Sequence, residues 1–251
     1  MPPRLATRYN KWFAVERPIL FEGLRYTKAE HSLVDRSLPK ISSDIEREIT
    51  RKLSAKKRRL GLFYVHGNGH PVFYSRKVGY FLQVLDFVPR VVDGQGRRRL
   101  PSEFKELHFA SGLHAKSALC CLNSNLFYWF VTVASDCRHV NKREVNNFPV
   151  DLDRLVKQQG VVLANLAERL MTDLNTNSED RAMRFGHDTL TVQAIIPKFS
   201  KSIIDEIDRV LAQHYGFTDE ELDFIINYDI KYRMGEELFE EDEDDIEEDE
   251  N

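Results

Sequence analysis

The chain has 251 residues, of which 42% are hydrophobic, so it can bury a core for one large domain or two small ones. No apolar run approaches the roughly 20 residues that a membrane helix needs, and the N-terminal Met1-Pro2-Pro3-Arg4 lacks the apolar region of a secretory signal. The cysteines Cys120, Cys121 and Cys137 form no disulfide framework. We therefore expect a globular cytoplasmic protein with no membrane partner.

The net charge of −4 is an average over two very different regions. Residues 236–251 contain 12 acids and no base, which leaves 28 acids against 36 Lys and Arg in residues 1–235, a charge of about +8. The bases gather in three stretches: Lys52 with Lys56, Lys57, Arg58 and Arg59; Arg97, Arg98 and Arg99; and Lys142 with Arg143. Clustered positive charge favours nucleic acid as a partner over a merely solvated surface.

The first half of the chain predicts one helix followed by short strands. Residues 1–40 show no periodicity and are expected to be an irregular lead-in. Ser43 and Glu46 have the spacing of a capping box, which predicts a helix from about Asp44 to Ala55. Aromatic and β-branched residues broken by Gly and Pro then predict strands. They are Phe63–Val65, Val72–Tyr74, Tyr80–Val84 and, after a glycine loop, Glu106–Phe109.

The second half predicts mainly helices. Ala115–Cys121 is a small-residue apolar helix, and the apolar run Leu126–Val133 is expected to be buried on most sides. Asn141 is a plausible helix cap before Pro149. Residues 151–175 form a long amphipathic helix that needs a partner, for which the helix starting at Ile203 is the obvious candidate.

Residues 203–235 predict a helix hairpin with defined ends. Gly216 stands where a left-handed helix end would fall, and Thr218 with Glu221 forms a capping box for the second helix. That helix runs into the polar and aromatic stretch Asn227–Met234, which packing alone would not require. We expect residues 236–251 to be disordered.

The predicted fold class is α+β, with a mixed β-sheet and a helical C-terminal part. The expected divisions are a lead-in (1–40), an α+β region (41–150), a helical region (151–235) and a disordered acidic tail (236–251).

One sequence pattern would be consistent with an enzyme. Asp93, Glu103 and Lys105 match the loose D…E-x-K pattern of metal-dependent nucleases, in which carboxylates hold the metal and the lysine orients water. The pattern is short, and a charged turn between strands is the favoured explanation, because Asp93 lies in a glycine loop and not on a core strand. His66 and His70 flank a Gly-Asn-Gly turn and favour a polar hairpin over a zinc site.

Two stretches combine aromatic, basic and amide groups. Tyr74-Ser75-Arg76-Lys77 brings a ring and two cations together, and residues 135–143 offer hydroxyl, imidazole, amide and guanidinium groups within nine residues. Such groups suit DNA, because Arg and Lys bind phosphate or guanine and Asn binds adenine. A capped helix start with surface charges accounts for about half of these residues.

Four strings occur together: Asn123-Ser124-Asn125-Leu126-Phe127-Tyr128-Trp129-Phe130, then Ser135-Asp136-Cys137-Arg138-His139-Val140-Asn141-Lys142-Arg143-Glu144-Val145, then Asn147-Phe148-Pro149-Val150, and the closing Asn227-Tyr228-Asp229-Ile230-Lys231-Tyr232-Arg233-Met234-Gly235. They resemble the C-terminal region of adenine-specific DNA methyltransferases of type II restriction-modification systems, including type IIG enzymes. The resemblance covers about residues 36–235. It implies a target-recognition domain that grips double-stranded DNA and selects the site.

In that family the S-adenosylmethionine loop and the Asn-Pro-Pro-Tyr type motif lie N-terminal to this region, and neither occurs here. Asn147-Phe148-Pro149-Val150 lacks the double proline and the stacking aromatic, so we assign no catalytic residue. A methyltransferase polypeptide that binds S-adenosylmethionine is the implied partner. The alternatives are a nuclease using Asp93, Glu103 and Lys105, or a non-catalytic interaction protein whose helix pair and acidic tail bind a partner.

The expected DNA-binding residues fall into two groups. Phosphate contacts are expected from Lys56, Lys57, Arg58, Arg59, Arg97, Arg98 and Arg99. Base or shape readout is expected from Tyr74, Arg76, Lys77, Arg138, Asn141 and Lys142, with Arg143 beside them.

Overall fold

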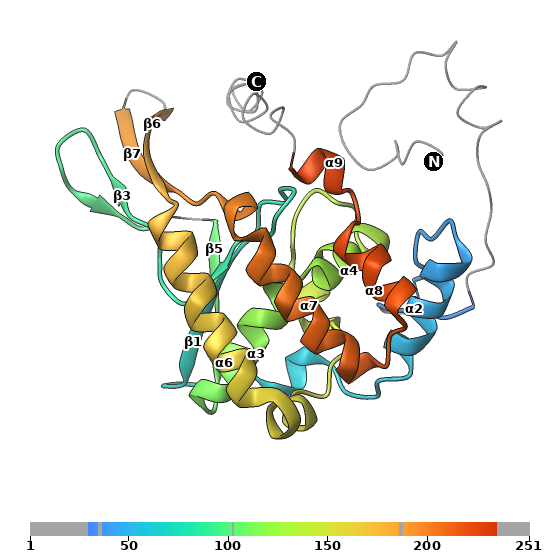
Figure 1. The fold of residues 1–251 in the computed structure, drawn as a ribbon. Coiled ribbons are helices and arrows are strands. Elements are labelled where there is room, and N and C mark those ends of the chain that lie inside the picture. Colours follow the sequence, from blue (N-terminus) through green and yellow to red (C-terminus); the bar gives the residue numbers. More distant parts are fainter. Residues whose placement is uncertain (1–29, 35–36, 102, 186–187, 235–251) are drawn as a thin grey trace, which may run out of the picture.

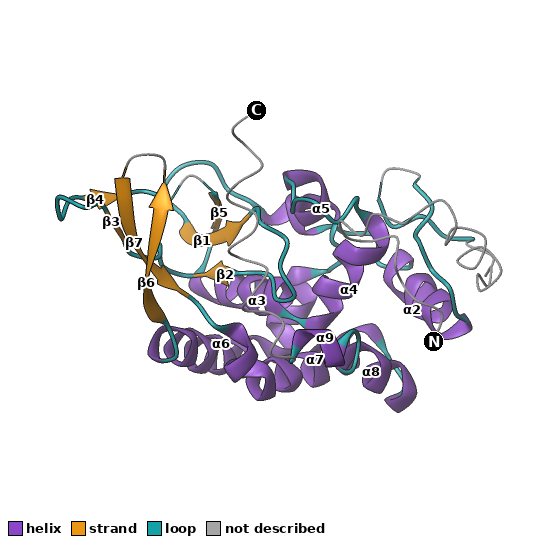
Figure 2. Ribbon diagram, turned by 90° about the horizontal axis from the view of Figure 1, so that it is seen from above, coloured by secondary structure: helices purple, strands orange, loops and turns teal. Residues whose placement is uncertain are grey.

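The computed structural model describes residues 30–34, 37–101, 103–185 and 188–234, and within them the α+β class is confirmed. Most of the predicted lead-in and the acidic tail lie outside the described residues. Figure 1 shows the long helices α6 (Leu152–Thr176) and α7 (Lys201–Tyr215) side by side across the molecule. In Figure 2 the strands and helix α5 (Lys142–Asn147) occupy one side, and α6, α7 and α8 (Asp219–Ile226) the other.

The first helix, α2 (Asp44–Ser54), begins as predicted, because the Ser43 side chain accepts a hydrogen bond from the Glu46 backbone N–H. The partners of the Glu46 carboxylate include residues outside the predicted capping box. Its carboxylate accepts from the Ser42 backbone N–H at 2.8 Å and from Trp129 Nε1 at 3.3 Å. The side chain therefore joins the start of α2 to helix α4 (Asn125–Ala134), deep in the core.

The first sheet is antiparallel and has the order β2-β1-β5. Its central strand β1 (His70–Ser75) pairs with β2 (Val84–Leu85) and along its whole length with β5 (Phe104–Phe109). The predicted strand at residues 63–65 is wrong in part, since Leu60–Phe63 is a 3-10 turn (η1) and only Tyr64 makes an isolated bridge. Of the predicted strand at residues 80–84, only its last residue is in a strand.

The second sheet has the order β4-β3-β7-β6 and is antiparallel throughout, as is the first, where a mixed sheet was expected. Its strands are β3 (Val91–Val92), β4 (Arg98–Arg99), β6 (Glu179–Phe185) and β7 (Asp188–Ala194). The β6–β7 hairpin was not predicted. Because β3 pairs with β7, this sheet joins the regions on either side of residue 150.

Helix α3 (Gly112–Asn123) packs between the first sheet and α6. The Cys120 thiol donates to the Leu163 carbonyl at 3.3 Å across the α3–α6 contact. On its other side α6 packs against α7, as predicted. Across this contact Arg169 makes a bidentate ion pair with Glu206 at 2.7 and 2.9 Å. One continuous hydrophobic cluster runs through the sheet and these helices.

The C-terminal hairpin has the predicted ends. Gly216 ends α7 with a φ of +70°, and Thr218 and Glu221 form the capping box of α8. A short helix α9 (Ile230–Arg233) follows and begins at Asp229, whose φ is +55°. The hairpin prediction is therefore confirmed, and α9 is where the unexplained polar stretch lies.

Arg233 explains that stretch, because its side chain is 1% exposed and lies at the centre of a buried polar network. The guanidinium donates to the Tyr80 carbonyl at 2.7 Å and to Asn125 Oδ1, and it stacks between the rings of Phe81 and Tyr128 at 4.2 and 4.4 Å. Two of the four strings, those around Asn125 and Arg233, therefore meet inside the molecule.

Asp208 of α7 completes what we call the Arg233 network: Tyr80, Asn125, Tyr128, Asp208 and Arg233. Its carboxylate accepts from the backbone N–H groups of Asn125 and Leu126 at 3.0 and 3.1 Å, at the start of α4. Burial raises the pKa of Asp208 to about 6, against these hydrogen bonds, which lower it. The network therefore joins α4, α7, α9 and the loop after β1.

Within the described ranges, no single helix is long and apolar enough to cross a membrane. Helices α3 and α4 pass that test only as a pair, which is bent by 62° at its junction.

His214, near the end of α7, is expected to make the stability of the folded state depend on pH. Both of its ring nitrogens are buried without a hydrogen-bond partner, and burial lowers its pKa to about 4. The unfolded chain binds a proton near pH 6.5, so the folded state loses stability as pH falls from about 6.5 to about 4, by up to about 3 kcal/mol. We expect His214→Phe to remove this loss. The check is urea unfolding of both proteins at pH 7.5 and 4.5, and an unchanged difference between the two pH values would contradict it.

Candidate nucleic-acid interface

The end of β1 meets the segment that precedes α5, although 60 or so residues separate them in the chain. The Val140 backbone N–H donates to the Arg76 carbonyl at 2.9 Å, and Lys77 forms an antiparallel bridge with His139. On the other side of the strand, the Arg76 backbone N–H donates to the Glu103 carbonyl at 3.0 Å. The two predicted DNA-contact stretches are therefore neighbours on one side of the molecule.

We call the cations brought together here the basic surface: Arg76, Lys77, Arg138, Lys142 and Arg143. Arg76 is half-buried and the other four are exposed. Arg143 donates to Ser37 Oγ at 3.0 Å and lies 3.4 Å from the Glu144 carboxylate, so part of its charge is already compensated. Glu103 and Asp136 are the nearby exposed acids on the same segments, and they reduce the net charge of the surface.

A tight turn fixes the start of this segment. Cys137 has a φ of +62°, a left-handed conformation that few residues other than glycine adopt, and its backbone N–H donates to Ser135 Oγ at 3.0 Å. The Cys137 side chain is buried, so the turn directs the chain outward at Arg138. The strained turn is thus held by the core and positions the exposed cations that follow it.

Asn141 caps helix α5 and at the same time has an exposed side chain. Its side chain caps α5 by accepting from the Glu144 backbone N–H, and the Glu144 carboxylate accepts from the Asn141 backbone N–H at 3.0 Å. The side chain is nevertheless exposed, and its amide makes only a long contact of 3.4 Å to the His139 carbonyl. The predicted cap is confirmed.

Tyr74 does not belong to this surface. It is 3% exposed and packs in the core, and burial raises the pKa of its hydroxyl. The prediction that its ring reads a base is therefore not supported by its position, because alternation along β1 turns this side chain inward.

The residues Lys56 to Arg59 of the first basic cluster mostly contact other parts of the chain. Lys56 Nζ donates to the His214 carbonyl at 2.7 Å and lies over the Tyr215 ring. Arg58 pairs with Asp153 at 2.5 Å and stacks on the Phe63 ring. Arg59 donates to the Lys56 and Arg58 carbonyls, and burial lowers its pKa. Only Lys57 is fully exposed, so three of these four predicted phosphate contacts serve the fold.

The second cluster surrounds Asp93, whose side chain is completely buried. Arg97 and Arg99 pair with its carboxylate at 2.9 and 3.1 Å, and the backbone N–H groups of Gln95 and Arg97 donate to it. These hydrogen bonds, led by that of the Arg97 backbone, lower the pKa of Asp93 to about 2. Arg98 is exposed and takes no part.

The nuclease pattern is not assembled. Asp93 holds together the β3–β4 turn of the second sheet, whereas Glu103 and Lys105 lie at and beside the start of β5 in the first sheet. In the part of the chain that the structure describes, no group of three or more His, Cys, Asp or Glu could hold a metal ion. Lys105 is instead an exposed cation opposite Tyr74 in the β1–β5 register.

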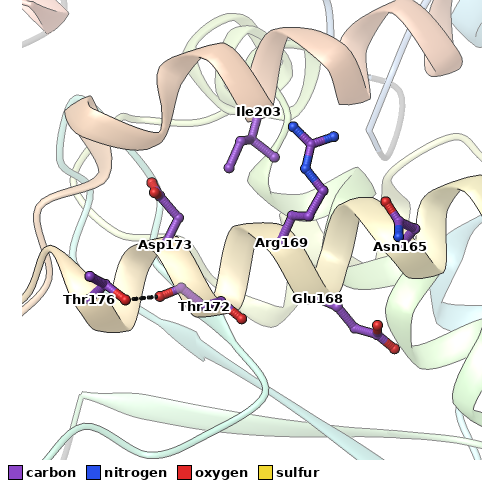
Figure 3. A pocket seen from close by; sticks show the side chains of 7 residues that line it. All are labelled: Asn165, Glu168, Arg169, Thr172, Asp173, Thr176 and Ile203. Carbon is purple, nitrogen blue, oxygen red and sulfur yellow. Dashed lines mark hydrogen bonds between the residues drawn. The ribbon is translucent and has the colours of Figure 1, made fainter.

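A hollow of about 430 Å³ lies on the helical side, between α6 and α7, and is shown in Figure 3. Its lining is mainly polar, and the labelled side chains include Arg169, Asp173 and Ile203. Arg169 pairs with Glu206 and Asp173 accepts from Ser200 Oγ at 2.6 Å, so the charged groups are already satisfied. The hollow contains no catalytic arrangement.

The chain matches no protein-family model, no curated protein and no solved structure.

Proposed function

We propose that this chain is the DNA-binding target-recognition part of an adenine-N6 DNA methyltransferase or a type II restriction-modification enzyme. The observation that carries the proposal is the meeting of β1 with the segment before α5, which gathers Arg76, Lys77, Arg138 and Lys142 on one surface. Exposed Lys and Arg side chains on a common surface supply the phosphate contacts that position a protein on duplex DNA.

The groups beside these cations suit the reading of bases. Asn141 presents a carboxamide, and Arg138 is exposed and makes no side-chain hydrogen bond or ion pair to the described residues. An Asn pairs well with adenine and an Arg with guanine in the major groove. Phosphate contacts from the neighbouring lysines would set the register in which these two side chains read the bases.

Two of the strings on which the proposed resemblance rests pack against each other. The string around Asn125 and the closing string around Arg233 are 108 residues apart in the chain, and they form one buried hydrogen-bonded network. Sequence strings that cooperate in this way belong to a single folded unit. Under this proposal the network holds the recognition domain together, and the exposed residues contact DNA.

The catalytic chemistry would come from another polypeptide in the cytoplasm. That partner would supply the S-adenosylmethionine site and the Asn-Pro-Pro-Tyr type motif that this chain lacks. It would also have to receive a flipped adenine, because the target atom is inaccessible within the duplex.

The experiment combines this chain with a methyltransferase polypeptide that carries such a motif, sought first in the gene immediately upstream. We expect transfer of labelled methyl groups to DNA only when both are present, and a strong reduction when the chain carries Arg138→Gln and Lys142→Gln. Equal methylation of the same sites without this chain would contradict the proposal.

A further inference from the structure

The second sheet has an outer face that the candidate interface does not include. Across its strands the register aligns Arg98 with Val92, Val92 with Thr191 and Thr191 with Ala182, and two residues further along it aligns Thr189 with Arg184. Paired residues of antiparallel strands project to the same side, and so do residues two apart on one strand. These side chains therefore share one face of the sheet.

Burial identifies this face as the outer one. Arg98, Thr191, Ala182, Thr189 and Arg184 are all exposed. The opposite face carries Val91, which is 6% exposed, and the half-buried Leu190 and Val192. The alternation of apolar and polar side chains along β7 thus leaves hydroxyls and guanidinium groups toward solvent.

The charge of the outer face is positive. Arg98 and Arg184 make no side-chain hydrogen bond or ion pair to any residue in the described ranges. The acid of this face, Asp180, is neutralised by Arg90 through two contacts of 2.7 and 2.6 Å. Two guanidinium groups therefore remain on this face, with the Thr191 hydroxyl between them.

Their separation fits a duplex. Neighbouring strands lie about 4.8 Å apart, and a strand rises about 3.3 Å per residue. Arg98 on β4 and Arg184 on β6 are separated by three inter-strand spacings and by two residues along the strand, so their Cα atoms lie about 16 Å apart. The major groove of B-DNA is about 12 Å wide, so the two side chains can reach phosphates on its opposite edges. The guanidinium groups and the Thr191 hydroxyl are phosphate ligands, whereas the amide of Gln193 is held by Asn175 and Ser178 at 2.9 Å each.

We infer that the outer face of the β4-β3-β7-β6 sheet is a second phosphate-binding surface for duplex DNA, with Arg98 and Arg184 as its cations and the Thr191 hydroxyl as an added donor. This inference rests on the proposed function and extends it. The surface grips the backbone and adds affinity that is independent of sequence, while the basic surface holds the groups that can read bases.

The test is a titration of a labelled 30-base-pair duplex of random sequence with the full chain, at several salt concentrations. Arg98→Gln with Arg184→Gln is expected to reduce the slope of log K against log salt by about 2, because each lost phosphate contact removes about 0.9. The matched control is Lys157→Gln with Arg209→Gln, which removes the same charge from exposed positions of α6 and α7. We expect this control to change the slope little.

Each outcome decides a different point. Wild-type affinity and slope in the Arg98/Arg184 variant, with a thermal melt like that of the wild type, would overturn the second surface and leave the proposed function standing. An equal loss in the control variant would also overturn it, since net charge alone would then explain the effect. Retention of most of the slope by Arg98→Lys with Arg184→Lys would support it. Absence of any DNA binding by the wild-type chain would instead remove the proposed function.

Discussion

Replacing Arg233 with leucine is expected to lower the free energy of unfolding by about 3–5 kcal/mol. The guanidinium is buried, and its removal takes away the hydrogen bonds that it donates to the Tyr80 carbonyl and to Asn125 Oδ1. It also removes a cation that interacts electrostatically with Asp208, and the stacking on two rings. Urea unfolding followed by circular dichroism measures the loss.

Two control variants separate the causes of that loss. Arg209→Leu removes the same type of side chain from an exposed position of α7 and should change stability by less than about 0.5 kcal/mol. Arg233→Lys keeps the charge but loses the planar fork, and we expect an intermediate loss. A loss below about 1 kcal/mol for Arg233→Leu would show that the buried network does not hold the C-terminal segment in place.

Replacing four cations of the basic surface with glutamine is expected to reduce duplex DNA affinity on the order of 10³-fold at 0.15 M salt. The variant carries Arg76→Gln, Lys77→Gln, Arg138→Gln and Lys142→Gln. Each phosphate contact contributes about 0.9 to the salt slope, which corresponds to about fivefold in affinity at this salt concentration. The slope should fall by about 3, because three of the four cations are expected on phosphate and Arg138 on a base. Fluorescence anisotropy with a labelled duplex measures both quantities.

The first basic cluster offers the contrasting variant. Lys56→Gln with Arg58→Gln breaks contacts to the His214 carbonyl and Asp153, so it should lower thermal stability and change DNA affinity little. A larger loss of DNA affinity here than in the variant of the basic surface would reverse the assignment of the two clusters.

Helix ends were predictable because their signals are local. Ser43, Gly216 and the Thr218–Glu221 box each act within one turn, and the structure has all three where the pattern indicated. The β6–β7 hairpin had no such signal. Its strand β6 reads Glu-Asp-Arg-Ala-Met-Arg-Phe, a mostly polar string, and β7 gains its place by pairing with β3, about 100 residues earlier in the chain.

The kinds of residue in the candidate site could be predicted from the sequence, but their positions in the fold only partly. The sequence counts cations but does not reveal their partners, so Arg58 looked like a phosphate ligand although Asp153, 95 residues away, pairs with it. Tyr74 looked available because its position near Arg76 suggested a common surface, whereas strand alternation turns it inward. The Lys77–His139 bridge depends on the fold, and no local pattern indicates it.

The most direct test of the account is the affinity of the full chain for a random-sequence duplex, measured at 0.05 and 0.2 M salt. We predict clear binding at the lower concentration and a fall in log K with a slope of about −4 or steeper, because at least four phosphate contacts are expected. No binding at 0.05 M salt, or binding that does not depend on salt, would contradict a DNA-binding role for this protein.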